Sequence, residues 1–241
     1  MIVIDRVSAT LRPDGKPAGY QHWRDLLFLH WEVPANLLQK IIPKPLIVDA
    51  FEGKAFIGLV PFVMKNVRPR WWTLGSGFNF LETNLRTYVV HQGKPGVYFF
   101  SLDANSVTAV LAANLGWGLP YYVARQSIHR DQDHIAYSNV RIGSKAAMEV
   151  EYSIGEQLGA LKLHSIEHFL LERYLLFVKR RGVMHSGQVS HTPYPAQRAT
   201  VLSLKQTMLE SFGLPKSDRP PDYMHYAAGV DVEVFPMIAR P

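Results

Sequence analysis

The sequence predicts a mainly β protein, an antiparallel β-barrel or cone with a few short helices. Of its 241 residues, 12% are aromatic and 16 are prolines spread along the chain, a composition typical of strand-rich and turn-rich proteins. Several segments alternate apolar and polar residues with a period of two, and short turns join them in succession. No linker or shift in composition divides the chain, so we expect one domain over residues 1–241.

Composition also limits the function classes. The net charge is +6, but no nucleic-acid-binding motif accompanies it, so we expect a basic surface and no nucleic-acid partner. The absence of cysteine excludes disulfides, thiolate metal sites and a cysteine nucleophile. The first residues, MIVIDRVSATLR, do not form a secretory signal, which favours the cytoplasm. No apolar run approaches the ~20 residues of a membrane span, so no membrane association is expected.

The first half of the chain predicts one helix and three strands. Pro34 opens a helical pattern that Pro43 ends, both at positions where proline is tolerated. Residues 54–64 are apolar on both alternating faces and predict a strand buried on both sides. Strands over 79–90 and 96–103 follow a loop with two adjacent tryptophans, Trp71-Trp72. That loop is a candidate lid or subunit contact, which would make the protein a homo-oligomer, and a core anchor is the alternative.

The second half predicts a meander framed by helices. Ser106 can cap a helix that runs to Leu115. Residues 121–154 then read as three strands joined by turns. A second helix begins near Ser165, and a further short helix is expected around 204–212.

The most informative segment is FNFLETNLRTYVVHQGKPGVYFFSLD, residues 78–103. Read as a strand, it places Glu82, Asn84, Arg86 and Tyr88 on one face, because side chains on one strand face lie two residues apart. The row from Glu82 to Arg86 is about 13 Å long. An ordinary half-buried strand would present this row to water. A strand of a small closed barrel would direct it inward, as a ligand site.

Other motifs in the sequence give weaker evidence of function. The segment His164-Ser-Ile-Glu-His168 matches H-x-x-E-H, a zinc-protease signature. Ser165 is a natural N-cap, however, which would leave His164 outside the helix and break the ligand geometry. We therefore expect no metal site. No phosphate-binding glycine loop or serine nucleophile motif occurs, and no cofactor is expected. Glu167, Glu172 and Arg173 are interpreted as a solvated helix face with local ion pairing, and a functional role is the alternative.

Eight segments in order resemble the bacterial domain-of-unknown-function 2071 family, also called YqjF-like, which is more distantly similar to acetoacetate decarboxylase. They cover about residues 20–238, and they are specific as an ordered set. They are HWRDLLFLHWEVP, FEGKAFIGLVPF, FLETNLRTYV, GKPGVYFFSLDA, GLPYYVAR, IEHFLLERYLLF, HTPYPAQRA and HYAAGVDVEVFP. The resemblance implies an acetoacetate-decarboxylase-like β-barrel or cone around a small-acid pocket.

The resemblance also implies a lost reaction. Acetoacetate decarboxylases carry a Gly-aromatic-Pro-Lys-Lys motif whose first lysine forms a Schiff base with a keto acid. The corresponding segment here is Gly118-Leu119-Pro120-Tyr121-Tyr122, and a phenol cannot form an imine. Glu82 stands where that family has a pocket glutamate. The chain therefore keeps the implied pocket without its nucleophile.

These residues give two main hypotheses. In the first, the protein binds a small organic acid and acts on it by acid–base chemistry of the lyase or isomerase type. Tyr121 and Glu82 would be catalytic. In the second, it is a non-catalytic ligand-binding or sensor protein. A third hypothesis makes the Trp71-Trp72 loop an assembly surface. The ligand-binding residues expected beside the catalytic pair are Arg86, Asn84, Tyr122 and Phe100.

Overall fold

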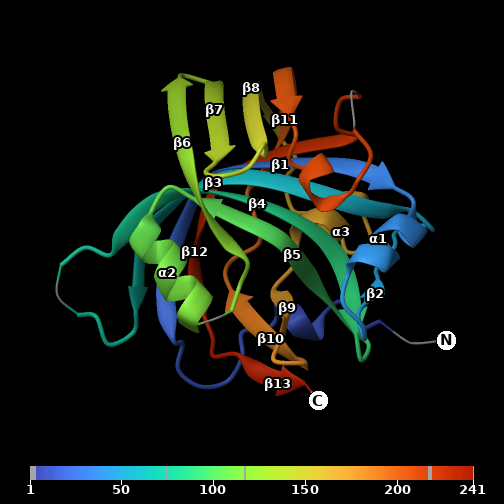
Figure 1. Ribbon diagram of the computed structural model, residues 1–241, viewed down its shortest axis with the longest axis vertical. Helices are drawn as coiled ribbons and strands as arrows, with labels where there is room; N and C mark the ends of the chain where they lie inside the picture. Colours follow the sequence, from blue (N-terminus) through green and yellow to red (C-terminus); the bar gives the residue numbers. More distant parts are fainter. Residues whose placement is uncertain (1–3, 74, 117, 217–218, 241) are drawn as a thin grey trace.

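The computed structural model describes residues 4–73, 75–116, 118–216 and 219–240. Within these ranges the chain is mainly β, as predicted (Figure 1). The strands are β1 (Gly19–Val33), β2 (Ile47–Val48), β3 (Ala55–Pro69), β4 (Phe78–His91), β5 (Lys94–Ala104), β6 (Tyr121–Asp131), β7 (His134–Arg141), β8 (Ala147–Gln157), β9 (Leu175–Arg180), β10 (Val183–Ser190), β11 (Ala196–Gln206), β12 (Tyr223–Val234) and β13 (Ile238–Arg240). The helices are α1 (Ala35–Ile41), α2 (Val107–Gly116) and α3 (Ile166–Leu171), with 3-10 turns η1 (Ser8–Thr10) and η2 (Glu210–Phe212).

The strands form one large sheet that closes on itself. Hydrogen-bonded neighbours follow the order β5-β6-β7-β8-β11-β12-β1-β3-β4, and β4 pairs again with β5. A second connection runs from β5 through β9 and β10 back to β12. Most pairs are antiparallel, as predicted, but β5 pairs in parallel with both β6 and β9. The β5–β6 pair is parallel because α2 carries the chain back across the sheet between them, on its outside (Figure 1).

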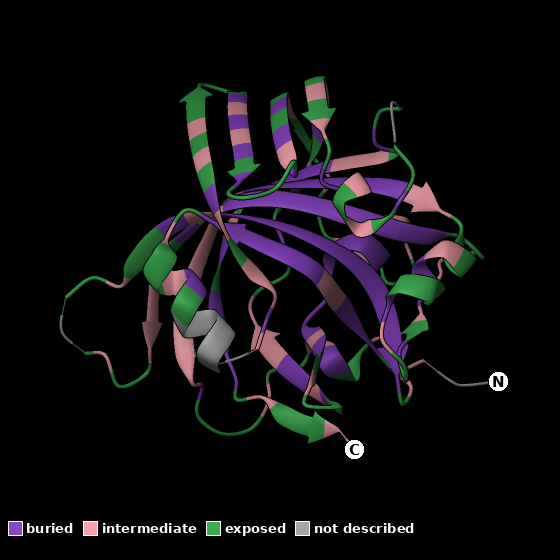
Figure 2. Ribbon diagram, in the orientation of Figure 1, coloured by how far each residue is buried: buried purple, intermediate pink, exposed green. Residues whose placement is uncertain are grey.

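Because the sheet curls, the strands shared by both closures are buried on their two faces. In Figure 2, β3, β4 and β5 are buried along most of their length and β1 is buried over Leu26–Trp31, whereas the free ends of β6, β7, β8 and β11 alternate. One face of β4 carries Leu85 and Val89 into a core with residues of β7 and β8. The other face carries Tyr88 into a core with α3. From Glu82 onward, alternate side chains of β4 therefore enter one of two interiors, so the period of two decides which interior each residue faces.

Most expected elements are present. Ser106 caps α2, since its hydroxyl accepts from the Ala109 amide at 3.3 Å. The meander is confirmed as β6, β7 and β8. The helix expected around 204–212 is wrong: β11 continues to Gln206, paired with β8, and only the 3-10 turn η2 follows. Pairing with a neighbouring strand decides this segment, and its local sequence pattern does not.

Candidate functional site

The polar row of β4 lies in the interior. Glu82, Asn84 and Arg86 are buried, and so is Tyr88 at the end of the row. The row is central in the sheet because β3 and β5 flank β4 on either side, pairing Arg86 with Gly58 and Phe99. Of the two alternatives left open by the sequence, the structure has the row that points inward.

Glu82 forms a buried pair with Tyr121. The phenol donates to the Glu82 Oε2 at 2.7 Å. Tyr121 reaches this face because it begins β6 opposite Leu102, after the turn at Gly118, where φ is +65°. Burial raises the pKa of Glu82 to about 7, against the opposing effect of hydrogen bonds from Tyr121 and Asn84. Burial and the nearby carboxyl hold the pKa of Tyr121 well above 10. A carboxyl group that titrates near neutrality is suited to take or give a proton.

Arg86 is a buried cation that has no counterion among the residues that the structure describes. Its side chain lies between Phe28 and Tyr88, with the guanidinium carbon 5.5 Å and 5.9 Å from the ring centroids. Its Nη2 donates to the Leu170 carbonyl at a long 3.4 Å, and its Nε has no partner among the described residues. Gly58 leaves room here, because a Cβ on it would come within 3.1 Å of the His30 ring.

His30 adds an unfilled acceptor beside this group. The Tyr88 hydroxyl donates to the Leu170 carbonyl at 2.6 Å, so it accepts at 2.7 Å from the His30 Nε2. That bond assigns the His30 proton to Nε2 and leaves Nδ1 as a lone-pair acceptor, which has no described partner. Burial and the charge of Arg86 lower the pKa of His30 well below 6.5, so the ring is neutral. The sequence reasoning missed His30, although a histidine within the apolar run FLHWEV was a signal.

The helix α3 supplies the carbonyl that holds Tyr88 and Arg86. Ser165 is its N-cap, as predicted, and its hydroxyl accepts from the His168 amide at 3.2 Å. His164 lies outside the helix with φ +69°, so the two histidines of the zinc-like motif do not share a helix face. Within the part of the chain that the structure describes, no group of three His, Cys, Asp or Glu residues could hold a metal ion.

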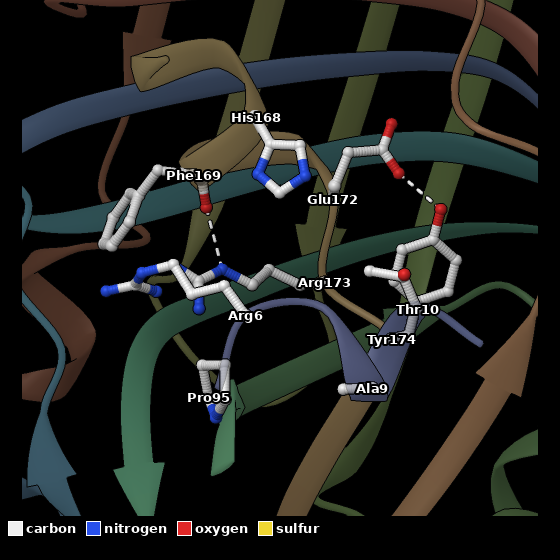
Figure 3. Close-up of a pocket in the computed structure, with 9 residues that line it drawn as sticks. All are labelled: Arg6, Ala9, Thr10, Pro95, His168, Phe169, Glu172, Arg173 and Tyr174. Atoms are coloured by element: carbon white, nitrogen blue, oxygen red, sulfur yellow. Dashed lines mark hydrogen bonds between the residues drawn. The ribbon is translucent and has the colours of Figure 1, made fainter. Parts of the chain in front are cut away.

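An ion cluster anchors the end of α3. Asp49 accepts two bonds from Arg6, at 2.7 and 2.8 Å, and one from Arg173 at 2.9 Å. Figure 3 shows Arg6 and Arg173 beside Phe169 at a cavity of about 10 Å³, room for one water molecule. The prediction that Glu172 and Arg173 belong to a solvated face is wrong, because both are buried. The Arg173 Nε also donates to the Phe169 carbonyl at 2.7 Å, so the cluster ties the end of α3 to Asp49.

Two expected site residues lie elsewhere. Tyr122 faces the opposite side of β6 from Tyr121 and stacks on Arg141, 4.1 Å from the ring centroid. Phe100 packs in the core of that same opposite side, against Tyr98 and Phe212. The pairing of β4 with β5 has a bulge between Leu85 and Arg86. The bulge changes which residues of β5 face each interior, and this explains why Phe100 lies on the opposite side from the polar row.

That opposite side holds a second polar network with its charges paired. The Arg141 Nη2 donates to the Asp103 Oδ1 at 2.8 Å, and its Nε donates to the same carboxylate. Asn139 donates to the Asp103 Oδ2 at 3.0 Å and accepts from Gln126 at 2.7 Å. This network ties β5, β6 and β7 together.

The fold is shared with acetoacetate-decarboxylase-like proteins. An acetoacetate decarboxylase-like enzyme from Sphingomonas wittichii RW1 aligns with a TM-score of 0.64 at 11% identity, covering 94% of each chain. The enduracididine biosynthesis enzyme MppR, complexed with pyruvate, gives a TM-score of 0.62 at 10% identity, over 94% of this chain and 91% of that one.

The chain belongs to the domain-of-unknown-function 2071 family, described as an uncharacterized conserved protein, whose model matches residues 20–231. It is 36% identical over 229 residues to the uncharacterized protein YqjF of Bacillus subtilis (strain 168), covering 93% of each chain. Among the described residues, no helix is long and apolar enough to span a membrane.

Proposed function

We propose that the protein binds a small organic acid at the polar row, with the carboxylate of the ligand on Arg86. The observation that carries this proposal is the missing counterion: Arg86 is only 8% exposed and forms no ion pair among the described residues. Burying an unpaired charge costs several kcal/mol (~3–5 when a partner is removed). A ligand carboxylate would accept from the Nε and a second nitrogen of the guanidinium in the bidentate geometry that arginine favours.

The pair at the other end of the row supports acid–base chemistry on that ligand. With a pKa of about 7, Glu82 is present in both protonation states near neutrality, and Tyr121 is a neutral donor. Asn84 lies between this pair and Arg86. The pyruvate complex of MppR, a protein of the same fold, supports a small keto acid as the ligand class. Chemistry of the lyase or isomerase type would need no Schiff base, which Tyr121 cannot form.

The alternative is a binding or sensor protein that keeps the pocket without turnover. Its supporting observation is the pair of tyrosines at the lysine positions of the related enzymes, Tyr121 and Tyr122. Turnover of a bound acid by the wild type, abolished in Tyr121→Phe while binding persists, would exclude this alternative. Binding with no turnover of any bound acid would favour it.

The first test is stabilisation by small acids. The wild type and Arg86→Met would be heated with a panel of small keto, hydroxy and unsaturated carboxylic acids. A ligand at about 100 times its dissociation constant should stabilise the wild type by about 2.7 kcal/mol and the variant not at all. The control is Arg198→Met, which removes an exposed arginine paired with Glu156 and should keep the response. An acid that stabilises both variants equally would contradict the assignment to Arg86.

The cavity beside Arg6 and Arg173 is not lined by Glu82, Asn84 or Arg86. We expect side chains around Arg86 to move when a ligand binds at the row. We expect the ligand to displace the long contact between Arg86 and the Leu170 carbonyl, which at 3.4 Å is the weakest restraint on the guanidinium.

A further inference from the structure

A second, larger cleft lies on the opposite side of the sheet from the polar row. Its volume is about 340 Å³, within the range of roughly 300–1,000 Å³ that small-molecule sites occupy. Strands β1, β3, β6, β8, β11 and β12 converge on it, together with the β6–β7 turn. It is lined by polar and charged side chains around a small apolar floor: Arg24, Asp25, Lys65, Arg130, Asp133, Ile154, Gln197, Tyr226 and Ala228.

Asp25 is held in this cleft in an unusual backbone conformation. Its φ is +50°, in the left-handed region that few non-glycine residues adopt, at an irregularity in the pairing of β1 with β3. Its Oδ1 accepts from the Tyr226 hydroxyl and from the Arg130 Nη1, both at 2.7 Å. No described donor reaches its Oδ2. Strained residues of this kind concentrate at functional sites.

The cleft is lined by both positive and negative side chains, and most of them are paired with each other or with neighbouring groups. Arg24 is bonded to Asp231 and to two backbone carbonyls, and Arg130 is bonded to Asp25. Lys65 forms no ion pair within the part of the chain that the structure describes. The Asp25 carboxylate is paired with Arg130 through its Oδ1 and keeps its Oδ2 without a described donor. Among the described residues, the unpaired charges of the lining are the Lys65 ammonium and the Asp133 carboxylate. A zwitterion therefore meets charges of both signs that suit it, whereas a purely anionic or purely cationic ligand is repelled by one of them.

We propose that this cleft binds a free α-amino acid. The carboxylate of the amino acid pairs with Lys65, and its ammonium donates to the Asp25 Oδ2. The apolar floor, formed by Ile154, Ala228 and the Tyr226 ring, takes the side chain of the ligand. The Tyr226 and Arg130 bonds hold Asp25 in place, and burial together with Asp25 raises the pKa of Tyr226 to about 12, so the phenol stays a neutral donor. The site is independent of the polar row at Arg86.

Calorimetric titration with the natural amino acids tests the proposal. We expect saturable binding of at least one amino acid. Its N-acetyl derivative lacks the ammonium and its decarboxylated amine lacks the carboxylate, so each should bind about tenfold more weakly or worse. Absence of saturable binding by every amino acid at millimolar concentration would overturn the proposal. Equal binding of the N-acetyl derivative would do so as well.

Four variants locate the binding site. Lys65→Met and Asp25→Asn should each weaken it about tenfold or more, and Lys40→Met, which removes an exposed lysine of α1, should leave it unchanged. Lys65 is exposed, so its substitution tests binding without disturbing the core. Arg86→Met separates the two sites: binding kept in this variant supports the cleft. Binding lost in Arg86→Met but kept in Lys65→Met would assign the amino acid to the polar row and refute the cleft.

Discussion

The two faces of the sheet at β4 and β5 each bury an arginine, and the surroundings of the two differ. Arg141 is 6% exposed and Arg86 is 8% exposed. Arg141 has a bidentate carboxylate partner, Asp103, which itself bonds Asn139. Arg86 has two aromatic rings and one distant carbonyl. At equal burial, the first arginine is satisfied by the fold and the second has donors left for a ligand.

This difference separates structural from functional charge. A buried ion pair with all its hydrogen bonds made holds strands in register, and removing one partner leaves the other charge buried without a counterion. An unpaired buried cation contributes little or negatively to stability until something binds it. The predictions below compare the two faces by these criteria.

The largest expected effect is on the paired face. Arg141→Met should lower the free energy of unfolding by about 3–5 kcal/mol, because it leaves the Asp103 carboxylate buried without its cation. Arg86→Met should not lower it in the absence of ligand and should raise it, because no carboxylate loses a partner and an unpaired buried charge is removed. Urea denaturation of both variants measures this. Equal losses of unfolding free energy in the two variants would contradict the view that Arg141 is a structural charge and Arg86 is not.

The second-largest expected effect is a pH dependence of the free energy of unfolding, which Glu82 causes on the face that carries Arg86. The pKa of Glu82 is raised from 4.5 to about 7 in the folded protein. The folded state thus binds the proton more tightly than the unfolded state, and the associated stability is complete below pH ~4.5 and is lost as the pH rises through ~7. Relative to Glu82→Gln, the wild type should lose about 2–3 kcal/mol between pH ~5 and ~8. A difference that stays constant over this range would mean that Glu82 titrates normally.

The smallest expected effect concerns Tyr121. Its hydrogen bond lowers the pKa of Glu82, so Tyr121→Phe should raise that pKa further, by about one unit. Carbon-13 NMR titration of the glutamate carboxyls measures the change. The neighbouring substitution Tyr122→Phe is the matched control and should leave the pKa of Glu82 unchanged, since Tyr122 lies on the other face. A response to Tyr122→Phe would contradict the assignment of the two tyrosines.

Much of the fold and part of the site followed from local sequence. A period of two was sufficient to place Glu82, Asn84 and Arg86 together, because β4 is regular over those residues. The same period places Tyr121 and Tyr122 on opposite faces of β6, where the structure has them. Phe100 was not predictable, because a bulge in strand pairing decides its face. His30, 58 residues from its partner Tyr88, required the sheet order.

The most direct test of the central claim is the NMR signal of the Arg86 Nε–H, assigned by its absence in Arg86→Met. We predict that a small carboxylic acid shifts this signal saturably in the wild type, with the same dissociation constant that its thermal stabilisation gives. Saturable binding of the acids that leaves the Arg86 signal in place, or no shift of it with any acid of the panel, would contradict the account of Arg86 as the ligand anchor.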